Sequence, residues 1–403
     1  MLKEFIGITS PKTKSLKLLY SLIRKLGPVR INTLSELTGY KHSTCARLLD
    51  ELVQEGLIYD SGIGESSGGR KPLMYVIHPH KNYVIGVELT SLYTTILLLN
   101  LNLEIVGIEK LKMSSECTGE YTLDYITSCI DSLLAKHQIA KEQLLGIGIG
   151  VIDPIDREQG TLKNPHLFTA GGWENLNIIE YLQKKNEILV LLDNGINLAA
   201  LAEYRKNHWK ETDNLTFVSN DLGIRYGAIF QGRMVSYKND IDDAFGHMTV
   251  DIHGRRCTCG SFGCLQAYSS IPAIRDEVVR KIKRGKYSIL QERVTDPGEI
   301  DFHHILEAIE EKDPLSLEVV QDAAYYYGVG LSNLILLLRP DVVICGGALI
   351  PKPLFFDVVS QTAQKRLRHN TQIQTRIIKS TTAYEIVAQG AGCMILDYFT
   401  EEY

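Results

Sequence analysis

The chain lacks the features that would place it in a membrane or outside the cell. No apolar run approaches the roughly 20 residues that cross a bilayer, and the first four residues, Met-Leu-Lys-Glu, do not begin an apolar signal segment. Cysteine is also scarce, with 8 irregularly spaced residues among 403, which argues for reduced thiols rather than a disulfide framework. We therefore expect a soluble cytoplasmic protein with no membrane partner.

The chain also lacks a strong excess of either charge, but its charge is unevenly distributed. Residues 1–80 hold 11 Lys and Arg against 7 Asp and Glu, whereas the remainder holds 32 against 41. A basic head on an acidic body predicts that only the head meets a polyanion. The length favours two or three domains, and a hydrophobic content of 44% supplies ordinary buried cores.

Three short helices are predicted in the head. Apolar side chains recur every three or four positions over residues 15–26, which predicts the first helix. The Thr-Leu-Ser-Glu sequence at residues 33–36 has the spacing of a capping box and predicts a second helix that ends at Gly39. The third helix is expected over residues 43–55, with Gly56 in the left-handed conformation. Its expected buried residues are Cys45, Leu48 or Leu49, Leu52 and Val53.

Two short strands, residues 57–59 and 73–77, are predicted after the third helix. The polar, glycine-rich segment between them ends in an Arg-Lys-Pro sequence. A basic hairpin tip after a helix-turn-helix pattern resembles the wing of a winged helix-turn-helix, although three helices alone would also fit any small bundle. We expect the third helix to enter the major groove of double-stranded DNA, with Arg47 on guanine or on phosphate. The expected DNA contacts are Lys41, His42, Ser43, Thr44, Arg47, Arg70 and Lys71.

From residue 84 onward the pattern changes to alternating strands and helices. Strands are predicted at residues 84–89, 94–99, 104–108, 145–151 and 188–192, with a helix at residues 120–136. A second series of strands follows at residues 216–219, 226–230, 233–235 and 342–345. Two α/β halves that each open with antiparallel strands predict a duplicated fold with a cleft between two lobes. The glycine-rich turns after these strands suit either phosphate binding or ordinary tight turns.

Three of the cysteines, Cys257, Cys259 and Cys264, are crowded into eight positions. Three thiolates leave a tetrahedral zinc site one ligand short, and His247, ten residues upstream of the first, can supply it. A site closed by four protein ligands is structural rather than catalytic. The alternative is a set of free thiols in a glycine-rich turn.

The Phe-Gly-His sequence at residues 245–247, followed by Cys-Thr-Cys-Gly-Ser-Phe-Gly-Cys, resembles the G-H…C-x-C-G-x-x-G-C signature of the ROK family of repressors, open reading frames and kinases. The resemblance extends over nearly the whole chain. It implies a winged helix-turn-helix domain at residues 1–80 and a two-lobed α/β fold of the actin-like, ribonuclease-H-like ATPase (sugar kinase) type. The first lobe would hold residues 81–194 with a C-terminal helix at about residues 383–403, and the second lobe residues 195–382. The resemblance also implies structural Zn²⁺ on His247, Cys257, Cys259 and Cys264.

Several positions depart from the kinases of this family. Those kinases have an Asn-Asp pair whose Asp is the general base on the sugar hydroxyl. Here the matching residues are Asn194 and Gly195, and glycine cannot accept a proton. Asp193 is adjacent, but neighbouring residues at a strand end usually point apart. The first phosphate loop, residues 88–92, has lost its glycines, and the second, residues 221–227, has gained a carboxylate and an arginine.

The positions that resemble the family's sugar site are changed as well. The family's Glu-x-Gly-His is Ala-Phe-Gly-His at residues 244–247, and its Cys-x-Glu is Cys-Leu-Gln at residues 264–266. Polar groups that remain can still hydrogen-bond a sugar. The candidate ligand contacts are Asn164, Asn194, His247 and Gln266.

The resemblance and the departures together predict a non-catalytic, sugar-responsive transcriptional regulator. The family's regulators of xylose, glucose and N-acetylglucosamine genes imply a repressor of carbohydrate-utilisation genes. A palindromic operator would be bound by a homo-oligomer, either a dimer or a tetramer. One alternative is an active ATP-dependent sugar kinase that carries a DNA-binding head. A second is a regulator that is controlled by a protein partner and has a vestigial cleft.

Overall fold

The computed structural model describes residues 2–7, 10–62, 73–152, 154–163, 165, 167–235, 244–370, 372–381 and 385–400. The chain separates into two compact units. The first contains Met1–Glu211, Gly232–Asp240 and Thr382–Tyr403, and the second contains Thr212–Gln231 and Ile241–Thr381. No helix in the described ranges is long and apolar enough to cross a membrane.

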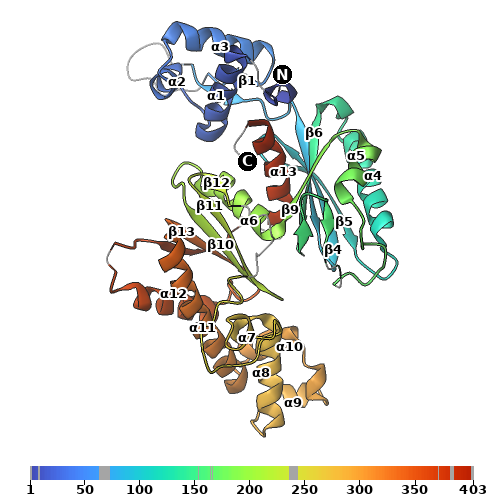
Figure 1. Cartoon of the computed structure of the whole chain (residues 1–403), viewed down its shortest axis with the longest axis vertical. Helices are drawn as coiled ribbons and strands as arrows, with labels where there is room; N and C mark the ends of the chain where they lie inside the picture. The colour runs from blue at the N-terminus through green and yellow to red at the C-terminus, as the bar shows by residue number, and fades with distance from the viewer. Residues whose placement is uncertain are drawn as a thin grey trace. The chain divides into compact units, whose positions relative to one another are not determined.

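The first part of the chain forms a small head of three helices and a two-stranded sheet (Figure 1). The helices are α1 (Pro11–Leu26), α2 (Ile31–Thr38) and α3 (His42–Gln54). Strand β1 (Ile58–Asp60) pairs antiparallel with β2 (Tyr75–Ile77). Helices α1 and α2 both pack against α3, and the predicted helices and strands are therefore confirmed. The buried side chains of the three helices include Leu16, Leu19, Tyr20, Ile23, Leu34, Cys45, Leu48, Leu49 and Leu52.

Three details of the head differ from the sequence prediction. Helix α1 begins one turn earlier because the Ser10 hydroxyl caps it, accepting a hydrogen bond from the Thr13 N–H at 3.0 Å. The predicted capping box was wrong, since α2 already begins at Ile31 and Thr33 lies inside it. Val53 is 40% exposed rather than buried. The buried face of α3 includes both Leu48 and Leu49 but does not include Val53.

The rest of the first unit is built on a five-stranded sheet in the order β5-β4-β3-β6-β9. Neighbours β5, β4 and β3 are antiparallel, and β6 and β9 join in parallel. Helices α4 (Gly119–Lys136) and α5 (Ile178–Asn186) contribute to the core on one face. The strands, all predicted, are β3 (Tyr83–Leu89), β4 (Tyr93–Asn100), β5 (Ile105–Lys112), β6 (Leu144–Val151) and β9 (Leu189–Asn194), and a small hairpin pairs β7 (Ile155–Asp156) with β8 (Thr161–Leu162).

Helix α13 (Ile386–Thr400) lies directly against strands β3 and β6 (Figure 1). A Cβ on Gly86 would lie 1.9 Å from the Ala388 carbonyl oxygen, and one on Gly148 would lie 1.9 Å from that of Ala391. No side chain fits at such distances, so glycine lets the helix backbone rest on the strands. Helix α6 (Gly195–Glu203) packs against α13 in the same layer.

A second five-stranded sheet, in the order β12-β11-β10-β13-β14, repeats this plan. Strands β10 and β11 are antiparallel, whereas β10, β13 and β14 are parallel neighbours. The duplication predicted from the two strand series is therefore present. The strands are β10 (Leu215–Asn220), β11 (Ile224–Phe230), β12 (Arg233–Met234), β13 (Val342–Gly347) and β14 (Arg376–Lys379). The helices of the second unit are α7 (Gln266–Ser269), α8 (Ile271–Lys283), α9 (Leu290–Arg293), α10 (Phe302–Glu310), α11 (Pro314–Leu338) and α12 (Pro353–Leu367).

Candidate functional site

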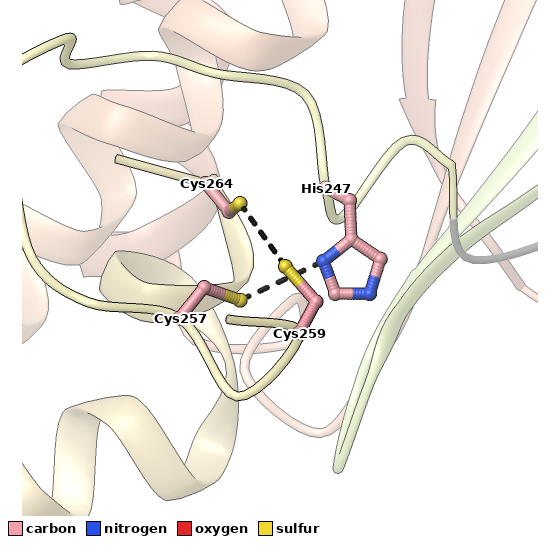
Figure 2. Close-up of side chains that lie close together, drawn as sticks. All are labelled: His247, Cys257, Cys259 and Cys264. Atoms are coloured by element: carbon pink, nitrogen blue, oxygen red, sulfur yellow. Dashed lines mark hydrogen bonds between the residues drawn. The ribbon is translucent and has the colours of Figure 1, made fainter. Parts of the chain in front are cut away.

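One histidine and three cysteines of the second unit lie close together and could hold a metal ion (Figure 2). The ligand atoms of His247, Cys257, Cys259 and Cys264 all lie within 4.8 Å of one another. Cys257 Sγ lies 3.6 Å from His247 Nδ1, and Cys259 Sγ lies 3.7 Å from Cys264 Sγ. Tetrahedral zinc separates two thiolate sulfurs by about 3.8 Å and a sulfur from an imidazole nitrogen by about 3.6 Å. The four residues therefore fit a zinc ion.

The loop that carries the cysteines is shaped by its backbone. An isolated antiparallel bridge joins Thr249 to Cys264. Gly263 has φ 71°, and a Cβ there would lie 1.6 Å from the Asp251 carbonyl oxygen, so only glycine fits. Burial, followed by hydrogen bonds that the Cys264 thiol donates to the neighbouring cysteines, raises the pKa of this thiol to about 12. Metals bind the thiolate, so a cation bound here would displace this proton.

The predicted DNA contacts of the third helix gather at the N-terminal end of α3. Lys41 is the N-cap residue, and the other four lie in the first two turns. Thr44 is half-buried, whereas the exposed residues are Lys41, His42, Ser43 and Arg47. These side chains lie away from the buried stripe of α3, as a surface for a partner requires. Arg70 and Lys71 lie outside the described residues, so the wing contacts stay a prediction.

At the end of β9, the Asp193 carboxylate is engaged by three donors of the protein. Its side chain is fully buried, and Arg157 Nη2 lies 2.7 Å from Oδ1. The same oxygen accepts hydrogen bonds from the Asn194 N–H at 2.6 Å and from Asn197 Nδ2 at 3.1 Å. Three donors therefore hold this carboxylate in place at the start of the β9–α6 turn.

Position 195 itself has little room for a side chain. A Cβ on Gly195 would lie 2.9 Å from Ile152 Cγ1 and 3.3 Å from Val387 Cγ1. Asn194, a predicted ligand contact, is buried and caps α6, its Oδ1 accepting from the Ile196 N–H at 3.1 Å. The Ile152 and Val387 side chains therefore leave little space beside position 195.

Glu88 stands at the end of β3, where the first phosphate loop begins. Its side chain is 3% exposed, and Oε2 is buried without a hydrogen-bond partner among the described residues. Burial, followed by the nearby charge of Glu385, raises the pKa of the Glu88 carboxyl to about 8, and Lys110 opposes the shift. A carboxyl group that is protonated near neutral pH cannot bind a magnesium ion as a carboxylate would.

Side chains of the protein itself accept hydrogen bonds around residues 221–227, the predicted second phosphate loop. Asp221 accepts a hydrogen bond from the Ala348 N–H at 3.1 Å and one from the Ser219 hydroxyl at 2.5 Å. Gln266, a predicted ligand contact, accepts from the Ile224 N–H at 2.9 Å through Oε1. The Ala348 and Ile224 N–H groups therefore donate to side chains of the protein itself. Because Gln266 follows Cys264 by two residues, the same contact joins the metal loop to this turn.

The predicted ligand contacts are divided among parts of the chain. Asn194 belongs to the first unit, whereas His247 and Gln266 belong to the second. Asn164 lies outside the described residues. Sequence reasoning missed Arg157, the partner of Asp193, because no local spacing connects residues 36 positions apart.

Comparison with known proteins decides the family. The model of the ROK family matches residues 84–397. The chain belongs to the ROK family. It is 26% identical over 394 residues to the xylose repressor of Bacillus subtilis (strain 168), which covers 98% of this chain and 97% of that relative.

Solved ROK structures confirm the predicted two-lobed α/β fold. A ROK family transcriptional regulator, a homolog of the E. coli MLC protein, matches with a TM-score of 0.79 and 23% identity over 97% of this chain and 98% of that one. A ROK hexokinase from Thermus thermophilus matches with a TM-score of 0.65 and 20% identity over 77% of this chain and 97% of the kinase. The family match begins at residue 84, so the head precedes a ROK body, defined as residues 84–397.

Proposed function

We propose that this chain is a DNA-binding transcriptional regulator, a sugar-responsive repressor of carbohydrate-utilisation genes. The observation that carries the proposal is the exposed polar and cationic end of α3, on a three-helix head that precedes a ROK body. In this proposal residues 1–80 form a winged helix-turn-helix, α3 reads the major groove, and a cytoplasmic dimer or tetramer presents two heads to a palindromic operator. Its similarity to a xylose repressor supports this assignment.

The ROK body acts in this proposal as a sensor and not as an enzyme. The position of the general base holds Gly195, and the adjacent carboxylate of Asp193 is held by Arg157. The internal hydrogen bonds of Asp221 support the same conclusion for nucleotide binding. A sugar or sugar derivative would contact Asn164, Asn194, His247 and Gln266, and its differential affinity for two states would set the repression level.

Zinc is proposed as a structural ion. His247, Cys257, Cys259 and Cys264 would hold it, and their closed set of four ligands leaves no position for substrate. Bound there, zinc would stiffen the loop whose Gln266 caps the turn after β10.

Binding to a DNA duplex tests whether α3 of the head contacts DNA. We expect Arg47→Ala to weaken binding of a duplex from upstream of the protein's own gene by about tenfold, the loss of one good arginine contact. Arg284→Ala removes an equally exposed cation from the end of α8 and serves as the matched control. Equal affinities for the wild type and the Arg47→Ala variant would argue against α3 as the DNA-reading element.

Two rival functions give different results in simple assays. An active kinase would turn over ATP with an aldose or amino sugar. A regulator controlled by a protein partner would show no thermal stabilisation by free or phosphorylated sugars, whereas a bound effector must raise native-state stability.

A further inference from the structure

A buried charge cluster joins the head to the ROK body inside the first unit. Arg24, in the last turn of α1, places Nη1 2.8 Å from Asp397 Oδ1 of α13. Arg205 places Nε 2.8 Å from Asp397 Oδ2. The side chains of Arg24 and Arg205 are 4% and 2% exposed, and that of Asp397 is fully buried. One carboxylate therefore binds a guanidinium of the head through one oxygen and a guanidinium of the body through the other.

The surroundings of Asp397 reinforce this arrangement. The Trp209 ring lies 5.0 Å from the Arg24 guanidinium and 4.3 Å from that of Arg205, so both cations also meet an aromatic face. Arg24 donates a further hydrogen bond to Thr400 Oγ1 at 3.2 Å. From the body, Lys210 Nζ donates to the Leu26 carbonyl oxygen at 2.7 Å, on the last residue of α1. The body thus contacts α1 through the Arg24 side chain and through the Leu26 carbonyl oxygen.

The element that carries Asp397 also reaches the other end of the sheet. Val387, in the first turn of α13, is the residue whose Cγ1 would lie 3.3 Å from a Cβ on Gly195. Ten helical residues separate Val387 from Asp397, a length of about 15 Å. Between them the helix backbone rests on Gly86 and Gly148 of the sheet. A movement of the β9–α6 turn would therefore be passed to Asp397 by a rigid, closely seated helix.

The junction also contains an irregular helix. Arg205 lies in the π-helix Tyr204–His208, which directly continues α6 from the β9–α6 turn. π-helical turns are rare and are often found where a fold has a function to perform. Both elements that begin beside Gly195, namely α13 and α6 with its π-helix, therefore end at the same buried carboxylate.

We propose that Asp397 is the positioning residue that fixes the DNA-binding head on the ROK body, acting through Arg24, and that α13 transmits effector binding to the head by this contact. The inference rests on the proposed function. Removing one partner of a buried pair leaves an uncompensated charge, so such pairs favour one geometry over others. Heads held in one orientation recognise one half-site spacing, whereas heads on a loose connection tolerate several.

The test uses the full chain and two operator duplexes. The first is the site defined by footprinting upstream of the protein's own gene, and the second carries five extra base pairs at its centre, about half a helical turn. Arg24→Met removes the head-side partner of Asp397. Arg205→Met is the matched control, because it removes an equally buried arginine but leaves the Arg24–Asp397 pair in place. The measured quantity is the dissociation constant for the lengthened duplex divided by the dissociation constant for the natural site.

We expect the ratio of dissociation constants to be about tenfold lower in the Arg24→Met variant than in the wild type, because the heads lose their fixed spacing. In the Arg205→Met variant, the ratio should stay within about twofold of the wild-type value. Both variants should lower the melting temperature, so stability alone does not separate them. If the Arg24→Met chain does not fold, Arg24→Lys keeps the charge but loses the planar fork, and it should reduce the ratio partially. An unchanged ratio in the folded Arg24 variant, or an equal loss in both variants, overturns the proposal. A wild-type chain that leaves no footprint upstream of its own gene overturns the proposed function itself.

Discussion

A carboxylate introduced at position 195 should destabilise the first unit without creating a kinase. The Cβ of the Gly195→Asp variant would lie 2.9 Å from Ile152 Cγ1 and 3.3 Å from Val387 Cγ1, inside the contact distance of about 3.5–4.0 Å for carbon atoms. Overpacking of this kind costs about 1–3 kcal/mol. The new carboxylate would also stand beside the buried Asp193, which disfavours its ionised form. We expect the free energy of unfolding of the first unit to fall by about 2 kcal/mol.

Tryptophan fluorescence makes this measurement specific to the first unit. The chain has two tryptophans, and both Trp173 and Trp209 are buried residues of that unit. Urea unfolding followed at the tryptophan wavelength therefore reports the unit that contains Gly195. Ile152→Ala, added to the Gly195→Asp variant, should recover about 1 kcal/mol beyond additivity because it removes the closest clashing atom.

Phosphate transfer from ATP to a sugar should stay at background in the wild type, in the single variant and in the double variant. A Gly195→Asp chain with wild-type stability would refute the steric reasoning. Sustained phosphate transfer by the Gly195→Asp variant would show that a single residue difference separates this protein from an active kinase.

Two further predictions concern buried ionisable groups. Because the pKa of Glu88 is about 8 in the folded chain against 4.5 as its ordinary value, the folded state keeps a proton that the unfolded state releases, and stability falls as pH rises through that window. Glu88→Gln should therefore stabilise the first unit by about 2–3 kcal/mol more at pH 7.5 than at pH 5.5, by urea unfolding, and a pH-independent difference would contradict the assignment. Cys264→Ser should abolish bound zinc, measured as one ion per chain in the wild type, and should increase hydrogen exchange in residues 246–269. Cys129→Ser, which removes a thiol outside the cluster, should leave the metal content unchanged.

The sequence predicted the elements well where a residue's neighbours along the chain determine its structure. The 3.6-residue and two-residue periodicities located the helices of the head and the strands of both sheets. The glycine at position 148 of β6 allows a close backbone approach to α13. The starts of the helices were harder to predict: Ser10 caps α1 before the apolar periodicity begins, and Thr33 lies inside α2 instead of capping it.

The contacts that decide function were out of reach of the sequence. The four metal ligands could be predicted because they lie within eighteen positions and have the chemistry of one ion. Arg157 and Asp193 are 36 residues apart, and Arg24 and Asp397 are 373 apart. No local pattern reports such pairs, because they depend on which surfaces the folded chain brings together. The engagement of Gln266 with the turn after β10 was hidden for the same reason.

In the proposed regulator, the ROK body binds a sugar without phosphorylating it. The decisive measurement incubates the operator complex of the wild-type chain with ATP, magnesium and a panel of aldoses and amino sugars, and follows DNA release and sugar phosphate in the same sample. We predict that at least one sugar releases the duplex while sugar phosphate stays at the level of a protein-free control. Sugar phosphate that accumulates over many turnovers, with the duplex still bound, would contradict the account.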